Sequence, residues 1–283
     1  MLGDGRELLE RLLIKEPDFV FNIAEGQGIG RSREARVPAV LEMLGIPFSG
    51  SDPLTMAITL DKDCARRLIQ STTVKVPQGS LWLPDEPLEE IEDWYDLPTS
   101  IVKPAWEGSS KGIRGKCVVD TPAELIAAIQ SHRQAYRQPV LVEEYIEGDE
   151  LTVGIVGNTP PKIIGVMRVL PRQKEERFIY SLEVKRDYLR RVAYECPPKL
   201  PQEQLRAVEE AALLVYHTLG CRDVARIDFR LRDGAPYFLE VNPLPGLNPE
   251  SSDLVILSKL AGWSYEQLIE SILKAALERN ELA

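Results

Sequence analysis

Two polar side chains interrupt an apolar stretch of the sequence. In FLEVNPLPGLNP, residues 238–249, Glu240 and Asn242 stand between apolar neighbours. Side chains two positions apart in a strand point to the same face, so both oxygen-bearing groups face one way. Burying such a pair costs free energy unless a partner compensates for it. We expect that partner to be a hard cation.

A neighbouring strand supplies a third oxygen ligand. Asp233-Gly234 predicts a two-residue hairpin turn within residues 224–242, which places Asp228 close to Glu240. Asp228, Glu240 and Asn242 then converge on one face, in a ligand set typical of Mg²⁺. Arg226 shares this face and could neutralise a transferring phosphoryl group or a tetrahedral oxyanion.

The alternative is that these residues form an exposed polar sheet face. Apolar residues at the neighbouring positions argue against it: Ile227, Phe229, Leu231, Leu239 and Val241. The sequence therefore favours a metal site on this hairpin.

A loop of small residues follows the strand that ends at Lys103. In IVKPAWEGSSKGI, residues 101–113, glycines and serines could bring backbone N–H groups against phosphate oxygens. The loop does not match the P-loop pattern GxxxxGK[ST], and a similar loop also occurs in ordinary hairpins.

A third segment, VLVEEYIEGDELTV at 140–153, reads as a strand entering a hinge. Its backbone could hydrogen-bond a purine edge, and Glu150 could bind ribose hydroxyls. A salt-bridged strand end explains each of these residues equally well when it is taken alone. Glycines 26, 28 and 30 do not have the GxGxxG spacing of a dinucleotide-binding fold.

Composition narrows the class of protein. The chain has 283 residues with 44% hydrophobic and 28% charged residues, which is typical of a globular protein with two or three subdomains. Its net charge of −10 argues against a nucleic-acid surface. The sequence has no run of 18 apolar residues, so it predicts no membrane span. Four scattered cysteines and a charged, helix-like start favour a reducing cytoplasm. With only two histidines, the chemistry must rest on carboxylates, lysines and arginines.

The elements that position these residues follow from periodicity and capping signals. We expect strands at 18–23, 100–105, 116–120 and 140–146, two strands within 151–171, and the hairpin at 224–242. We expect helices at 5–15, 121–136, 201–220 and 264–279, one ending at Gly45 and one beginning near Asp61. Residues 77–98 read as a linker and 173–191 as a long mobile connection. The mixture predicts an α+β fold with antiparallel sheets.

Taken in order, these motifs resemble the ATP-grasp superfamily, specifically the D-alanine–D-alanine ligase family. The resemblance runs from about residue 18 onward and is carried by ARVPAVLEMLGIPFSGS, DK at 61–62, VKPAWEGSSKG, VLVEEYIEGDELTV, RIDFRL and LEVNPLPGL. It implies two α/β subdomains that clamp ATP, preceded by a partial Rossmann-like N-terminal domain. We expect an N-terminal substrate and dimer domain at 1–58, a lid subdomain at 59–143 and a C-terminal subdomain at 144–283.

The resemblance also implies roles for individual residues. Lys62 and Lys103 match lysines that bind ATP phosphates. Ser109 and Ser110 match the loop that covers the phosphates, and Lys185 matches a lysine that closes over the γ-phosphate. Residues Glu143, Glu144, Tyr145 and Ile146 match the adenine hinge, and Glu150 the ribose-binding acid. Arg226 matches an arginine beside the acyl-phosphate, while Gly246 and Ser251 fall where the second substrate's carboxylate is held. Asp228, Glu240 and Asn242 match the ligands of two Mg²⁺ ions, or of Mn²⁺.

The implied reaction is ATP-dependent amide formation between a small carboxylate and an amine, in a cytoplasmic enzyme that could be a homodimer. Three departures from the family pattern fall in the amino-acid half of the site. The N-terminal strand and turn that carry a substrate-binding glutamate are not found, Arg186 replaces an aromatic residue, and Glu25-Gly26 replaces His-Gly. Arg186 could select an acidic substrate. The alternative functions are a nucleotide-binding protein without ligase turnover and a ligase for substrates other than D-alanine.

Overall fold

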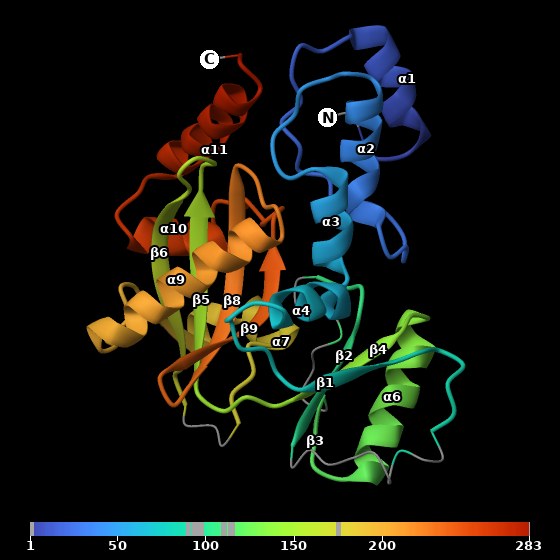
Figure 1. The fold of residues 1–283 in the computed structure, drawn as a ribbon, viewed down its shortest axis with the longest axis vertical. Coiled ribbons are helices and arrows are strands. Elements are labelled where there is room, and N and C mark those ends of the chain that lie inside the picture. The colour runs from blue at the N-terminus through green and yellow to red at the C-terminus, as the bar shows by residue number, and fades with distance from the viewer. Residues whose placement is uncertain are drawn as a thin grey trace.

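Two antiparallel sheets and a helical N-terminal part make up the structure, a computed structural model that describes residues 3–88, 91, 99–108, 112, 117–173 and 177–282 (Figure 1). The strands are β1 (Gly79–Trp82), β2 (Ser100–Pro104), β3 (Val118–Val119), β4 (Val140–Glu144), β5 (Asp149–Val156), β6 (Lys162–Pro171), β7 (Val192–Glu195), β8 (Val224–Arg232) and β9 (Ala235–Asn242). The helices are α1 (Arg6–Lys15), η1 (Arg33–Ala35), α2 (Arg36–Met43), α3 (Pro53–Leu60), α4 (Lys62–Gln70), α6 (Pro122–Tyr136), α7 (Leu182–Arg186), α8 (Tyr188–Arg191), α9 (Gln202–Thr218), α10 (Asp253–Leu260) and α11 (Tyr265–Arg279).

The smaller sheet has the order β1-β4-β2-β3 and is packed against α6. Thr121 caps α6 in a capping box with Glu124, and Pro122 occupies the first helical turn. Leu125 and Ile129 of this helix are buried against the apolar face of the sheet. The opposite face is therefore free to present Lys103 and the end of β4 to the rest of the molecule.

The larger sheet has the order β7-β6-β5-β8-β9 and is covered on both faces. Helices α9 and α4 pack on one face, and α10 with α11 packs on part of the other (Figure 1). Because strand side chains alternate, Ile227 and Phe229 of β8 point into the α9 core while Asp228 points to the opposite face. The polar residues of this sheet thus lie on the α10 side.

The N-terminal part is joined to the larger sheet by a buried carboxylate. Asp223 is fully buried and accepts hydrogen bonds from the backbone N–H of Gly50, from Asn158 and from Arg279. Upstream of this joint, α1 and α2 form a small core of their own, and downstream α3 leads directly into α4. The joint therefore sets where α4 begins relative to the sheet.

The predicted α+β class is confirmed, as are α6, α9, α11 and the 224–242 hairpin. Several other elements differ from the prediction. The expected linker contains β1, the expected mobile connection contains α7 and α8, and residues 18–23 form one bridge from Val20 to Phe48 rather than a strand. Within the part of the chain that is described, no helix is both long and apolar enough to cross a membrane. The division at 1–58, 59–143 and 144–283 stays a proposal.

Candidate active site

The β8–β9 hairpin closes at the predicted turn, and its register at Asp228 lies within one residue of the one that this turn alone would set. Asp233 and Gly234 both have positive φ, 52° and 77°, as a type I′ turn requires. Asp228 lies directly opposite Glu240, and Arg226 opposite Asn242. The hairpin therefore brings all four side chains together as expected.

A β-bulge at Leu239 corrects one part of that prediction. The register shifts between Asp228 and Phe229, because Phe229 pairs with Phe238 and leaves Leu239 without a partner. Phe238 and Val241 consequently both pack in the core, while Leu239 lines a cavity beside Glu240. The expectation that Leu239 belongs to the apolar face is wrong.

The carboxylates of the hairpin are held by cationic side chains. Arg226 Nη2 lies 2.9 Å from an Asp228 oxygen and 3.4 Å from a Glu240 oxygen. Lys62 Nζ, at the start of α4, lies 3.2 Å from the other Glu240 oxygen. Thr152 Oγ1 donates a hydrogen bond of 2.9 Å to Asp228. The two carboxylates therefore sit in a dense and largely buried charge network.

Burial and charge act in opposite directions on these groups. Burial alone would raise the pKa of Glu240, but Lys62 and Arg226 hold that pKa at about 2. For Asp228, burial outweighs the neighbouring Arg226 and raises the pKa. Burial would lower the pKa of Arg226, but Asp228 and Asp253 raise it overall. The cationic neighbours thus outweigh burial at Glu240 but not at Asp228.

The donor set suits a hard divalent cation. Asp228, Glu240 and Asn242 offer only oxygen ligands, although the Asn242 side-chain oxygen already accepts a 3.0 Å hydrogen bond from the Leu244 N–H. Across the described residues, no cluster of three or more His, Cys, Asp or Glu side chains could hold a metal. Two carboxylates and one amide are therefore the set that fits Mg²⁺, and their role as ligands stays a prediction.

The first cavity lies between the two sheets and has a volume of ≈ 80 Å³. Residues from both sheets line it: Ile101, Lys103, Glu143, Glu144, Glu150, Asp228, Arg230, Leu239 and Glu240. The hinge residues Tyr145 and Ile146 also line it, as do Tyr180, just ahead of α7, and Lys185 on α7. Most of the residues expected to bind a nucleotide therefore share one cavity.

Two of the predicted hinge residues have side chains engaged elsewhere. Lys103 Nζ forms an ion pair of 2.5 Å with Glu143, which is 2% exposed. Glu144 pairs with Arg232 at 2.5 Å. The carboxylates of Glu143 and Glu144 therefore orient basic residues, which leaves the backbone of the hinge to contact a ligand.

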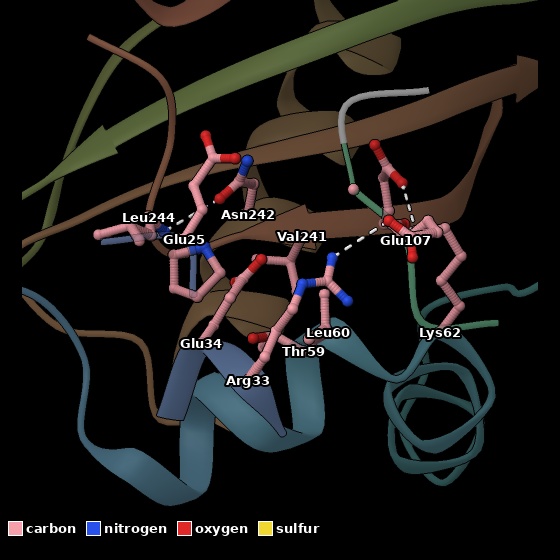
Figure 2. A pocket seen from close by; sticks show the side chains of 13 residues that line it. Glu25, Arg33, Glu34, Thr59, Leu60, Lys62, Glu107, Val241, Asn242 and Leu244 are labelled. Atoms are coloured by element: carbon pink, nitrogen blue, oxygen red, sulfur yellow. Dashed lines mark hydrogen bonds and ion pairs between the residues drawn. The ribbon is translucent and has the colours of Figure 1, made fainter. Parts of the chain in front are cut away.

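The second cavity lies between the N-terminal part and the end of β9, with a volume of ≈ 30 Å³ (Figure 2). Arg33 donates to the Trp106 carbonyl at 2.6 Å and to Glu107 at 3.2 Å, and Lys62 donates to the Glu107 carbonyl. Figure 2 shows these side chains converging on Glu107. Glu240 lines both cavities, so the hairpin carboxylate stands at their boundary.

Comparison with known proteins decides the family. The family model described as "D-ala D-ala ligase C-terminus" matches residues 72–274. D-alanine–D-alanine ligase from Fervidobacterium nodosum is 32% identical over 94% of this chain and 84% of its own length. The chain belongs to the D-alanine–D-alanine ligase family. An uncharacterized protein of Sinorhizobium fredii, y4sG, is similar as well, with 34% identity over 96% of this chain and 80% of that protein.

Solved structures agree with this family assignment. D-alanine–D-alanine ligase from Bacillus anthracis, in complex with ATP, matches with a TM-score of 0.76 and 27% identity over 97% of this chain and 84% of that one. The fold is therefore the ATP-grasp fold of the D-alanine–D-alanine ligase family, whose members are enzymes that form C–N bonds.

The remaining predicted residues of this ligase-family protein are distributed as follows. Lys185 on α7 lies 3.0 Å from Asp253, and Arg186 beside it is exposed. Ser251 is exposed near the start of α10, and Gly246 lies against Ser252. Ser109 and Ser110 lie outside the described residues. The roles of all of these residues stay predictions.

Three site residues were not predicted from the sequence. Asp253 contacts Arg226 and Lys185, Glu107 accepts from Arg33, and Arg230 binds Glu150 at 2.8 Å. The alternation along β8 could have indicated Arg230, because it follows Asp228 by two positions. No local pattern indicates Asp253 or Glu107, since their partners are far away in the sequence.

Proposed function

We propose that this protein is an ATP- and Mg²⁺-dependent ligase that joins a carboxylate to an amine through an acyl-phosphate. The observation that carries the proposal is that Glu240 lines two cavities, one lined by the hinge and basic residues and the other by the N-terminal part. Lys62, which lines the second cavity, lies 3.2 Å from Glu240. In the proposal, a nucleotide binds in the first cavity and a substrate carboxylate in the second. Family membership supports the same reading.

In the proposed reaction, the substrate carboxylate attacks the γ-phosphorus of ATP and ADP leaves. The amine then attacks the acyl carbon, loses a proton, and inorganic phosphate leaves with the carbon–oxygen electron pair. The protein contributes orientation and charge neutralisation instead of a covalent nucleophile. This matches a site rich in fixed cations, in which Arg226 and Lys62 have little freedom to move.

Each basic residue then has a definite task. Lys103 and Lys62 hold phosphate oxygens, and Arg226 neutralises charge that develops near the hairpin. Lys185 approaches the transferring group from α7. Asp228, Glu240 and Asn242 would hold Mg²⁺, which supplies Lewis-acid neutralisation of the phosphates when it is bound. Lys62 and Arg226 lower the pKa of Glu240 and so favour its ionised form before a metal binds.

The test is ADP and phosphate release from Mg·ATP with D- and L-amino acids, offered singly and in pairs. D-alanine heads the panel because several relatives are named D-alanine–D-alanine ligase. Release that requires two amino acids together would establish the ligase and name its substrates. Glu240→Gln, which removes one charge at the boundary of the cavities, is the matched inactive control.

Two other results have distinct meanings. ATP binding without release for any pair would favour a nucleotide-binding protein, or a ligase whose substrates lie outside the panel. No ATP binding at all would contradict the proposal. The homodimer and the cytoplasmic location stay predictions.

A further inference from the structure

One buried arginine contacts three separate segments of the first cavity. Arg230 of β8 is 5% exposed and lies on the same strand face as Arg226 and Asp228. It lines the cavity, but it is not among the residues that the hairpin chemistry requires. Its guanidinium has five N–H donors in a fixed plane, so it can hold several acceptors at once.

The first segment that Arg230 holds is the hinge between the sheets. Its Nη1 lies 3.3 Å from the Tyr145 hydroxyl, 3.4 Å from the Ile146 carbonyl and 3.3 Å from the Gly148 carbonyl. The guanidinium also lies over the Tyr145 ring, 5.3 Å from its centroid. The hinge conformation is therefore tied to this one side chain.

The other two segments are bound by the second terminal nitrogen. Arg230 Nη2 donates to Glu150 at 2.8 Å and to the Phe178 carbonyl at 2.6 Å. Phe178 lies just ahead of α7, and its carbonyl also accepts a 3.0 Å hydrogen bond from Tyr145. Arg230 and Tyr145 thus connect the hinge directly to the segment that leads to Lys185.

We propose that Arg230 is a positioning residue that couples occupancy of the nucleoside end of the first cavity to the placement of α7 and its Lys185. The inference rests on the proposed function, because it assumes that the cavity binds a nucleotide. A ligand that fixes the hinge and Glu150 would also fix the Phe178 carbonyl through Arg230. Lys185 would then be in place before the γ-phosphoryl group reacts.

Charge balance supports this arrangement. Burial raises the pKa of Glu150 and Arg230 opposes that effect, so the arginine helps to keep a carboxylate available at the cavity wall. At the other end, Lys185 pairs with Asp253 at 3.0 Å and lies over the Tyr180 ring. α7 is therefore anchored at Lys185 by Asp253 and at its entry by Arg230.

The experiment uses ADP, which lacks the γ-phosphate. Calorimetry measures its affinity, and hydrogen exchange with mass spectrometry follows the α7 amides with and without saturating ADP. In the unmodified protein, ADP should slow exchange in α7 by at least about tenfold. In Arg230→Met this protection should be lost even at saturating ADP, while exchange in α9 stays unchanged. A merely structural role would instead raise exchange throughout the larger sheet.

Two further variants make the test specific. Arg168→Met removes an arginine paired with Asp149 at 2.8 Å in the same sheet and should keep the ADP protection of α7. Arg230→Lys replaces Arg230→Met in the test if Arg230→Met does not fold. It should also lose the ADP protection of α7, because one ammonium cannot reach acceptors on all three segments.

Full protection of α7 in folded Arg230→Met at saturating ADP would overturn the inference. The inference would also fail if the unmodified protein binds ADP and its α7 amides are not protected. If the unmodified protein binds neither ADP nor ATP, the proposed function fails, and the inference fails with it.

Discussion

The joint at Asp223 allows a quantitative prediction. Asp223→Asn keeps the size of the side chain, and asparagine tolerates the left-handed backbone at this position, where φ is 64°. Each carboxylate oxygen accepts two N–H groups: Gly50 and Arg279 on one, Asn158 and Arg279 on the other. In either orientation of the asparagine side chain, its NH2 group would face two N–H donors, and both of those hydrogen bonds would be lost.

The expected loss follows from those bonds. Hydrogen bonds to a charged group contribute about 1.5–3 kcal/mol each, and breaking a buried ion pair costs about 3–5 kcal/mol. We therefore expect the free energy of unfolding to fall by about 4 kcal/mol. For a chain of this size that corresponds to a fall in Tm of roughly 8–16 °C.

Differential scanning calorimetry on the ligand-free protein is the assay. Asp120→Asn is the matched control, because Asp120 also pairs with an arginine, Arg177 at 2.6 Å, but its side chain is 46% exposed. The control should leave Tm unchanged. A Tm for Asp223→Asn within about 2 °C of the unmodified protein would refute the reasoning that this buried charge holds the parts together.

Other predictions concern the site itself. Lys62→Met leaves Glu240 without its α4 partner and should lower kcat for ADP release about 100-fold with folding retained, as judged by circular dichroism; an unchanged kcat would remove Lys62 from the mechanism. Lys103→Met removes the 2.5 Å ion pair of Glu143 and, among the described residues, leaves it a 3.9 Å contact to Arg66. It should weaken ATP binding about tenfold in calorimetry, and unaltered affinity would contradict the phosphate role of Lys103. Chelation of divalent ions by EDTA should abolish ADP release and added Mg²⁺ should restore it, whereas full activity in EDTA would exclude the metal ligands. Arg186→Ala should raise KM for the carboxylate substrate and leave ATP affinity unchanged, and an equal loss in both would show that Arg186 does not select the substrate.

The hairpin could be predicted from sequence because its information is local. Asp233-Gly234 fixes the turn and the pairs next to it, as far as Phe229 with Phe238, so Asp228 could be placed within one residue of Glu240. Counted from the turn alone, Asp228 would pair with Leu239, and the bulge brings Glu240 opposite it instead. The bulge at Leu239 was missed because Phe238 and Leu239 are both large and apolar. Alternation cannot decide which of them is buried; the core selects Phe238, and the extra residue then turns toward the cavity.

Helices with local sequence signals could be predicted for the same reason. The helices predicted at 121–136 and 264–279 are α6 and α11, and the structure shows a capping box at Thr121 and another at Ser264. In contrast, β1 is only four residues long and lies at a sheet edge, and α7 is five residues long, so neither gives a strong periodic signal. Both depend on tertiary contacts, as α7 does on Val184, which packs beside Val169 of β6.

The last turn of α11 has a consequence for how the chain acquires its structure during synthesis. Arg279 donates to the Phe48 carbonyl at 2.9 Å across a separation of 231 residues, and it also supplies the ion pair to Asp223. A ribosome releases residue 48 long before residue 279, so the N-terminal part must wait for a partner that is made 231 residues later. Contacts of such long range form slowly. A nascent chain stalled before Arg279 would therefore hold both sheets but leave the second cavity without a fixed wall.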